Sequence, residues 1–188
     1  MGNKAILMSI QPRWVAEILN GNKTIEVRKK FPKDYVGWVY IYCTKGKTLG
    51  SIIKINSEET SKLLKKPIGT ICGINKGFEN EKDYNLKGKV VARFWCDKVE
   101  EIEHYPYEAP EHPRGYQIAY DTQTTNWDKL CEMSCLSRDE LFDYLGRNNG
   151  YAIHISKLEI FDKPREINEF GITKAPQSYM FVEDSTTI

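Results

Sequence analysis

The tightest constraint on the fold comes from residues 5–32, where the sequence predicts a strand, a helix and a returning strand in quick succession. The apolar run at residues 5–10 is typical of a buried strand. Pro12 suits the first helical position because its missing N–H would have no partner there. Apolar residues then recur at helical spacing, as Trp14, Val15, Ile18 and Leu19. Gly21 stands where a left-handed helix terminator is expected, so the chain must turn back directly into the second strand.

This second strand carries an unusual density of charge. Strict alternation predicts that Ile25 and Val27 lie on one face and that Glu26 and Arg28 share the other. Lys23 sits at the corner between the helix and the strand, so an ammonium, a carboxylate and a guanidinium are expected to converge. The plainer alternative is a solvated edge strand on which Glu26 and Arg28 pair with each other. Exposed pairs contribute only about 0–1 kcal/mol, so stability alone is a weak reason for this arrangement.

At these residues the sequence resembles a known family. The spacing Gly-x-Lys-x-x-Glu-x-Arg resembles the signature of ASCH-domain proteins, small barrels related to the PUA fold, and is formed here by Gly21, Lys23, Glu26 and Arg28. Residues 174–182, KAPQSYMFV, resemble a closing strand common in phage and bacterial members. The resemblance implies an α+β fold, a PUA-like (ASCH) small mixed β-barrel with flanking helices. We expect a single such domain over residues 1–183, with an irregular insertion at about 103–126 and a frayed tail at 184–188.

The remaining patterns predict further elements. Strands are expected over residues 37–44, 88–103 and 150–162, the second of them bent near Arg93. Helices are expected over residues 58–66 and 127–135, and a capping box beginning at Ser137 opens another. Pro164 is expected to start a short helical turn. His154 alternates with the isoleucines of its strand, so it should face water or a cleft. We interpret the proline- and tyrosine-rich insertion as folded over the mouth of that cleft.

Composition and charge exclude several classes of protein. The formal net charge of +1 argues against a globally basic nucleic-acid binder, so any RNA binding must depend on a local patch. No apolar run approaches the roughly 18 residues of a membrane span, and no secretory signal is recognisable. We therefore expect a cytoplasmic protein without membrane association.

The five cysteines are an odd number without a close-spaced framework, which indicates free thiols in a reducing compartment. Cys131 and Cys135 are four residues apart, and His104 and His112 lie upstream. This spacing matches none of the common zinc patterns. We expect neither a metal nor another cofactor.

The first functional interpretation is an RNA- or nucleotide-binding cleft lined by Lys23, Glu26 and Arg28, which would recognise single-stranded RNA or a modified nucleoside. Cations concentrate in residues 23–33 and could attract phosphate locally. Glu26 could accept a hydrogen bond from a base amino group or fix the geometry of Arg28. An unpaired base could stack on Tyr42, Trp14 or Tyr179. With the closing segment added by family resemblance, the candidate ligand contacts are Lys23, Glu26, Arg28, Lys29, Tyr42, Gln177, Ser178 and Tyr179.

The second interpretation is an enzyme. The resemblance implies that the nucleophilic lysine of a family amidohydrolase, which acts on N-acetylated cytidine, would correspond to Lys23. Lysine attacks only as a neutral amine, and a nearby carboxylate such as Glu26 opposes that state. Glu26 also occupies the position of that enzyme's assisting threonine. Ribonuclease action is a further possibility, with Lys23 and Glu26 transferring protons and Arg28 at the scissile phosphate. The residue types leave open whether any reaction is catalysed.

Overall fold

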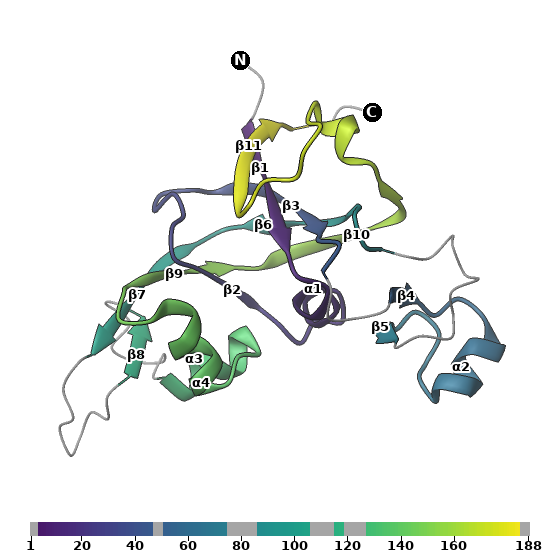
Figure 1. Cartoon of the computed structure of the whole chain (residues 1–188), viewed down its shortest axis with the longest axis horizontal. Helices are drawn as coiled ribbons and strands as arrows, with labels where there is room; N and C mark the ends of the chain where they lie inside the picture. Colours follow the sequence, from purple (N-terminus) through teal and green to yellow (C-terminus); the bar gives the residue numbers. More distant parts are fainter. Residues whose placement is uncertain (1–3, 47–50, 75–85, 106–114, 119–126, 185–188) are drawn as a thin grey trace. The chain divides into compact units, whose positions relative to one another are not determined.

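The computed structural model describes residues 4–46, 51–74, 86–105, 115–118 and 127–184 (Figure 1). The chain divides into two compact units, and each is assembled from separate stretches of sequence. The first unit comprises residues 1–21, 38–94 and 158–188. The second unit comprises residues 22–37 and 95–157. The expectation of one domain over residues 1–183 stays a prediction.

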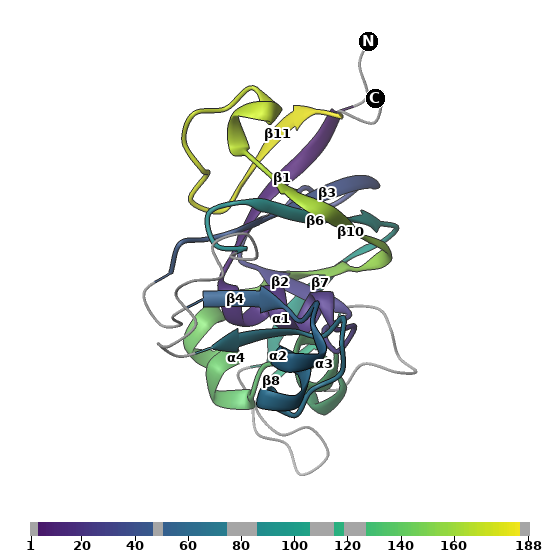
Figure 2. The same ribbon diagram turned by 90° about the vertical axis from the view of Figure 1, so that its right-hand side faces the viewer.

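The main sheet of the first unit is mixed and has the strand order β10-β6-β3-β1-β11. Its strands are β1 (Lys4–Ile10), β3 (Gly37–Cys43), β6 (Val90–Cys96), β10 (Ser156–Arg165) and β11 (Tyr179–Glu183). Strand β1 runs parallel to β3 and antiparallel to β11, and Figures 1 and 2 show β1 and β11 side by side. Every residue of β1 after Lys4 is buried, because strands pair with it on both sides and both of its faces are covered.

Helix α1 (Pro12–Leu19) follows β1 as expected, with Pro12 in its first turn and Val15, Ile18 and Leu19 buried. Gly21 has a φ of 77°, the left-handed conformation that ends the helix at low steric cost. Strands β4 (Ser51–Lys54) and β5 (Ile71–Ile74) form a small antiparallel sheet, and α2 (Glu58–Leu64) lies between them in the sequence. The Asn20 amide holds this sheet to the end of α1: its Nδ2 donates to the Ile71 carbonyl at 2.6 Å, and its Oδ1 accepts from the Ile71 N–H at 3.1 Å.

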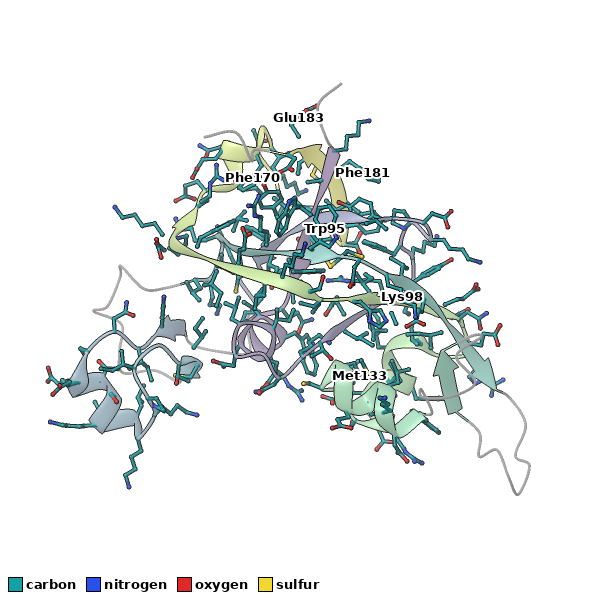
Figure 3. The ribbon with its side chains drawn as sticks, turned by 180° about the vertical axis from the view of Figure 1, so that it is seen from behind. Trp95, Lys98, Met133, Phe170, Phe181 and Glu183 are labelled. Carbon is teal, nitrogen blue, oxygen red and sulfur yellow. The ribbon has the colours of Figure 1, made fainter. Side chains whose placement is uncertain are left out.

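The core of the first unit joins residues from both ends of the chain. It contains Ala5, Leu7, Tyr40, Tyr42, Val90, Phe170 and Val182. Phe170 comes from the 3₁₀ turn η2 (Ile167–Phe170), and its ring centroid lies 4.9 Å from that of Tyr40. Figure 3 labels this buried ring together with Phe181 of β11, which is exposed. The C-terminal segment is therefore part of the hydrophobic core.

The second unit is built on an antiparallel sheet with the order β2-β9-β7-β8. Its strands are β2 (Ile25–Arg28), β7 (Val99–Tyr105), β8 (Gly115–Ile118) and β9 (Gly150–His154). Strand β8 falls within the stretch expected to be irregular, and β7 extends into it as far as Tyr105. Most of the predicted insertion, residues 106–114 and 119–126, lies outside the described residues.

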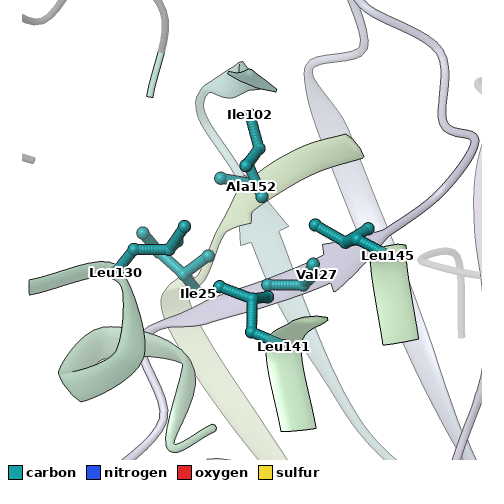
Figure 4. Packing of buried hydrophobic residues seen from close by; sticks show 7 residues of the cluster. All are labelled: Ile25, Val27, Ile102, Leu130, Leu141, Leu145 and Ala152. Carbon is teal, nitrogen blue, oxygen red and sulfur yellow. The ribbon is translucent and has the colours of Figure 1, made fainter. Parts of the chain in front are cut away.

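Two helices cover one face of this sheet, α3 (Trp127–Ser134) and α4 (Arg138–Leu145) (Figures 1 and 4). The buried cluster between them and the strands consists of Ile25, Val27, Ile102, Leu130, Leu141, Leu145 and Ala152. The capping box predicted from Ser137 is present: its Oγ accepts from the Glu140 N–H at 3.1 Å, and the Glu140 carboxylate accepts from the Ser137 N–H at 2.9 Å. Leu130 of α3 and Leu141 and Leu145 of α4 pack both helices against the sheet.

Three expectations are corrected. In the part of the chain that the structure describes, the sheets are not closed into a barrel. The expected long strand over residues 88–103 bends after Cys96, at Asp97 and Lys98, and Arg93 lies within the regular strand β6. Residues 150–162 divide between β9 and β10, which belong to different sheets.

Pro164 lies inside β10 and does not start a turn; the turn begins at Ile167. Strand β10 is at the edge of its sheet, where the missing N–H of proline costs no ladder hydrogen bond. None of the described helices is long and apolar enough to cross a membrane.

Candidate functional site

Lys23, Glu26 and Arg28 converge in the second unit, and we call them the β2 ion cluster. Glu26 is at its centre: its Oε2 lies 3.4 Å from Lys23 Nζ, and its Oε1 lies 3.0 Å from Arg28 Nη2. The exposed fractions of the three side chains are 1% for Lys23, 7% for Glu26 and 11% for Arg28. The convergence follows from the spacing, but the depth of burial is greater than a solvated edge strand would allow.

The alternation of β2 explains how the charges come together. Ile25 and Val27 face α3 and α4, and so Glu26 and Arg28 are directed to the opposite face. Strand β2 is the edge strand of its sheet and pairs with β9, where Glu26 lies opposite Ile153. Glu26 and Arg28 therefore pair with each other on an edge strand, as the plainer alternative expects, yet they are shielded from solvent. That they line a ligand cleft stays a prediction.

Lys23 also completes the end of a helix. Its ammonium donates to the Ser134 carbonyl at 2.6 Å, and the Thr24 N–H donates to the Met133 carbonyl at 2.9 Å. The last carbonyls of a helix have no partner within the helix, and the helix dipole favours a cation there. Lys23 thus connects the C-terminus of α3 to the carboxylate of Glu26.

These contacts bear directly on catalysis by Lys23. Both Glu26 Oε2 and the Ser134 carbonyl accept hydrogen bonds from an ammonium, and neither favours the neutral amine. A nucleophilic lysine needs the opposite environment, one that is apolar or contains other cations. The arrangement therefore suits a fixed positive charge better than a nucleophile.

Lys29 differs from the ion cluster in being exposed. It follows β2 directly, and its ammonium lies 5.5 Å from the centroid of the Tyr144 ring. Farther along, Lys33 lies 3.4 Å from Glu101 in an exposed pair. Phosphate could approach these side chains without displacing the core.

The other candidate ligand residues belong to the first unit. Tyr42 is only 6% exposed, and its burial raises the pKa of its hydroxyl. Gln177 is exposed, and Ser178 and Tyr179 are half-buried. The sequence-based list therefore falls into two groups, one in each unit. That the two groups line one cleft stays a prediction.

Ser9 connects the members of the first-unit group and was missed by sequence reasoning. It lies opposite Tyr42 in the parallel pairing of β1 with β3. Its Oγ donates to the Pro176 carbonyl at 2.6 Å, and its N–H donates to the Ser178 carbonyl at 2.8 Å. The signal in the sequence was a single hydroxyl within an otherwise apolar strand.

A second charged group in the second unit was also missed. Glu100 accepts on both oxygens, with His154 Nε2 2.5 Å from Oε2 and Lys98 Nζ 2.5 Å from Oε1 (Lys98 is labelled in Figure 3). His154 pairs with Ile25 in the strand register, so it lies on the face that the helices cover. His154 and Glu100 are 54 residues apart in sequence, so pattern alone could not join them.

Four of the five cysteines lie in surroundings that disfavour the reactive thiolate. Cys43 and Cys96 are buried, and burial raises the pKa of each thiol to about 12. Burial also raises the pKa of Cys72 and of Cys131. Such thiols are protonated at neutral pH and so are poor nucleophiles. Among the described residues, no group of His, Cys, Asp and Glu side chains could hold a metal ion.

Comparison with solved structures identifies the fold. The ASCH protein of Zymomonas mobilis matches with a TM-score of 0.55 and 14% identity, over 96% of this chain and 88% of that one. A Tyr-to-Phe variant of that protein matches with a TM-score of 0.55 and 13% identity, over 97% of this chain and 92% of that one. A Ser-to-Ala variant matches with a TM-score of 0.54 and 13% identity, over 96% and 89%. No family model and no curated protein matches. The chain thus shares its fold with these ASCH structures.

Proposed function

We propose that this protein is a cytoplasmic RNA- or nucleotide-binding protein of the phage and bacterial ASCH type, which recognises single-stranded RNA or a modified nucleoside at β2. The observation that carries the proposal is the buried ion cluster of Lys23, Glu26 and Arg28. Buried ion pairs can often be replaced by apolar residues without loss of stability. Stability is therefore a weak reason for three charges here, and recognition of a charged ligand is a stronger one.

We propose separate roles for Glu26 and Arg28, and their contacts support this division. Both carboxylate oxygens of Glu26 are occupied, one by Lys23 and one by Arg28. Glu26 therefore orients the guanidinium of Arg28. Accepting a hydrogen bond from the amino group of a base is its lesser role. Arg28 is the most exposed of the three, and its planar donors match a phosphate or a base edge.

Further side chains in each unit are proposed as ligand contacts. Lys29 supplies a further phosphate contact at the end of β2. In the first unit, the exposed amide of Gln177 and the hydroxyls of Ser178 and Tyr179 suit base edges or phosphate. Tyr42 supports this group from the core, opposite Ser9.

The test is the binding of a fluorescein-labelled single-stranded RNA of mixed sequence, followed by anisotropy at several salt concentrations. Arg28→Ala and Lys29→Ala should each weaken binding, and each should reduce the salt slope by about 0.7, the value for one phosphate contact on a single strand. Lys29→Ala is less disruptive to the fold than Arg28→Ala, because the Lys29 side chain is exposed and its removal leaves both partners of Glu26 in place.

Lys62→Ala is the matched control. Lys62 is a lysine of α2 that is 82% exposed, so its removal subtracts the same charge from the first unit and leaves the second unit unchanged. It should leave both the affinity and the salt slope unchanged. A wild-type protein that shows no binding at low salt, or a Lys62→Ala variant that loses as much affinity as Lys29→Ala, would contradict the proposal.

The alternatives are an amidohydrolase acting on N-acetylated cytidine, with Lys23 as its nucleophile, and a ribonuclease, in which Lys23 would transfer a proton. The two acceptors of its ammonium argue for a fixed charge. Release of acetate from N-acetylated cytidine by the wild-type protein, with loss of that activity in Lys23→Ala, would replace the binding proposal with the enzyme.

A further inference from the structure

The second unit presents an aromatic ring and a cation together where β2 ends. The Lys29 ammonium lies 5.5 Å from the centroid of the Tyr144 ring. The ring is 38% exposed, and Lys29 is exposed as well. An exposed cation–π contact contributes about 0.5–1 kcal/mol, which gives only a modest structural reason for this pair.

Close packing determines where this pair lies. Leu141 and Leu145 anchor α4 in the buried cluster, and Tyr144 directly precedes Leu145 (Figure 4). A Cβ added at Gly150 would lie 2.7 Å from Leu145 Cδ2 and 3.1 Å from the Arg28 carbonyl oxygen. The C-terminal end of α4 and the last residue of β2 thus meet across a glycine. Tyr144 and Lys29, the neighbours of Leu145 and Arg28 in sequence, are brought together as a consequence.

Exposed cations lie close to Lys29 and Tyr144 in sequence. Lys29 and Lys30 follow β2, and Arg147 follows α4 three residues after Tyr144; all three side chains are exposed. Asp143, which is also exposed, is the acidic neighbour of Tyr144 in sequence. With Glu140, one helical turn before Tyr144, these segments hold three cations and two carboxylates, in a chain whose net charge is +1. A local patch of this kind is what phosphate binding by a nearly neutral protein requires.

We propose that Tyr144 stacks an unpaired base of single-stranded RNA and that Lys29 binds the adjacent phosphate. This inference rests on the proposed function and names the base contact of the same site. Rings on exposed positions beside cations are the usual platform for single strands, because every base offers a π face. The ligand must be unpaired, since the bases of a duplex are stacked within the helix.

Two labelled strands of equal length test the proposal: oligouridylate and an abasic ribose-phosphate strand. Tyr144→Ala should weaken binding of oligouridylate about tenfold, which is within the range measured for the loss of one stacked base. It should leave binding of the abasic strand and the salt slope unchanged. Tyr144→Phe keeps the ring and should bind oligouridylate as the wild type does. Lys29→Ala should weaken the binding of both oligouridylate and the abasic strand, and it should lower the salt slope by about 0.7.

Phe142→Ala is the control, because Phe142 lies on the same helix and is also 38% exposed. Its ring lies 6.4 Å from that of His104, and we expect its removal to leave RNA binding unchanged. The stacking role is overturned if Tyr144→Ala binds oligouridylate as tightly as Phe142→Ala does. It is also overturned if Tyr144→Ala loses as much affinity for the abasic strand as for oligouridylate. In both cases RNA binding itself stands. If the wild-type protein binds neither strand, the proposed function itself fails. Thermal unfolding of each variant verifies that the fold is retained.

Discussion

Lys23 is the residue whose role changes most between sequence and structure. Alternation and spacing were enough to predict that Lys23, Glu26 and Arg28 converge. They could not predict that Lys23 also holds the end of α3, because Ser134 lies 111 residues away and the contact is to a backbone carbonyl. Ser9 was hidden for a similar reason, since its partners are carbonyls of residues 176 and 178. Contacts from a side chain to a distant backbone leave no pattern in a sequence.

A substitution at Lys23 should therefore affect stability. Lys23→Met keeps most of the side-chain volume but removes the donor to Ser134 and one partner of Glu26. We expect the free energy of unfolding to fall by about 1–3 kcal/mol, because buried acceptors lose a charged donor. Urea denaturation monitored by tryptophan fluorescence measures this change.

The double variant Lys23→Met with Glu26→Gln provides the control. Removing the buried carboxylate should recover part of the loss, since fewer charges are then left without a partner. Equal stability of Lys23→Met and the wild type would mean that these contacts contribute nothing to the folded state.

At the scale of elements, the local signals at the ends of α1 and α4 were reliable, whereas Pro164 did not start the expected turn. The proline at the start of α1, the glycine after it and the capping box of α4 each reflect chemistry within a few residues, and each is present. Sheet assignment was not predictable in the same way. Residues 88–103 and 150–162 are β-prone throughout, and only the partner strands determine that the chain changes sheets near Asp97 and Ile155. Strand β8 was missed because it follows a proline-rich stretch that suggested irregular structure.

Gly150 tests the packing of α4 against β2. A methyl group there would lie within 3.1 Å of the Arg28 carbonyl and closer still to Leu145, so one of them must move. We expect Gly150→Ala to lower the free energy of unfolding by about 1–3 kcal/mol, as overpacked cores do. Denaturant melts of the variant and the wild type measure the difference.

If the clash is with Leu145, the two positions should be coupled. Leu145→Ala should cost less in the Gly150→Ala background than in the wild type, because the smaller side chain leaves room for the methyl group. Additive effects would show that the close approach seen at Gly150 is not what holds α4 in place.

For the whole molecule, family resemblance predicted more than composition did. Composition indicated only a folded chain of low net charge, whereas the motif around Glu26 and the closing segment indicated the ASCH type. The ASCH structures of Zymomonas mobilis share the fold over 96% or more of this chain at 13–14% identity. The expected barrel closure was wrong for the described residues, because the strands divide among separate sheets. At such low identity, function has to be argued from the residues of β2 and its surroundings.

The central claim is that β2 and its cations meet the ligand, and nuclear magnetic resonance tests it most directly. Single-stranded RNA is titrated into ¹⁵N-labelled protein, and the shift of each amide is followed. The account predicts the largest shifts at residues 23–30 and around Tyr144, with the amides of α2 unchanged. Shifts confined to other parts of the chain, with those amides unmoved at saturation, would contradict it.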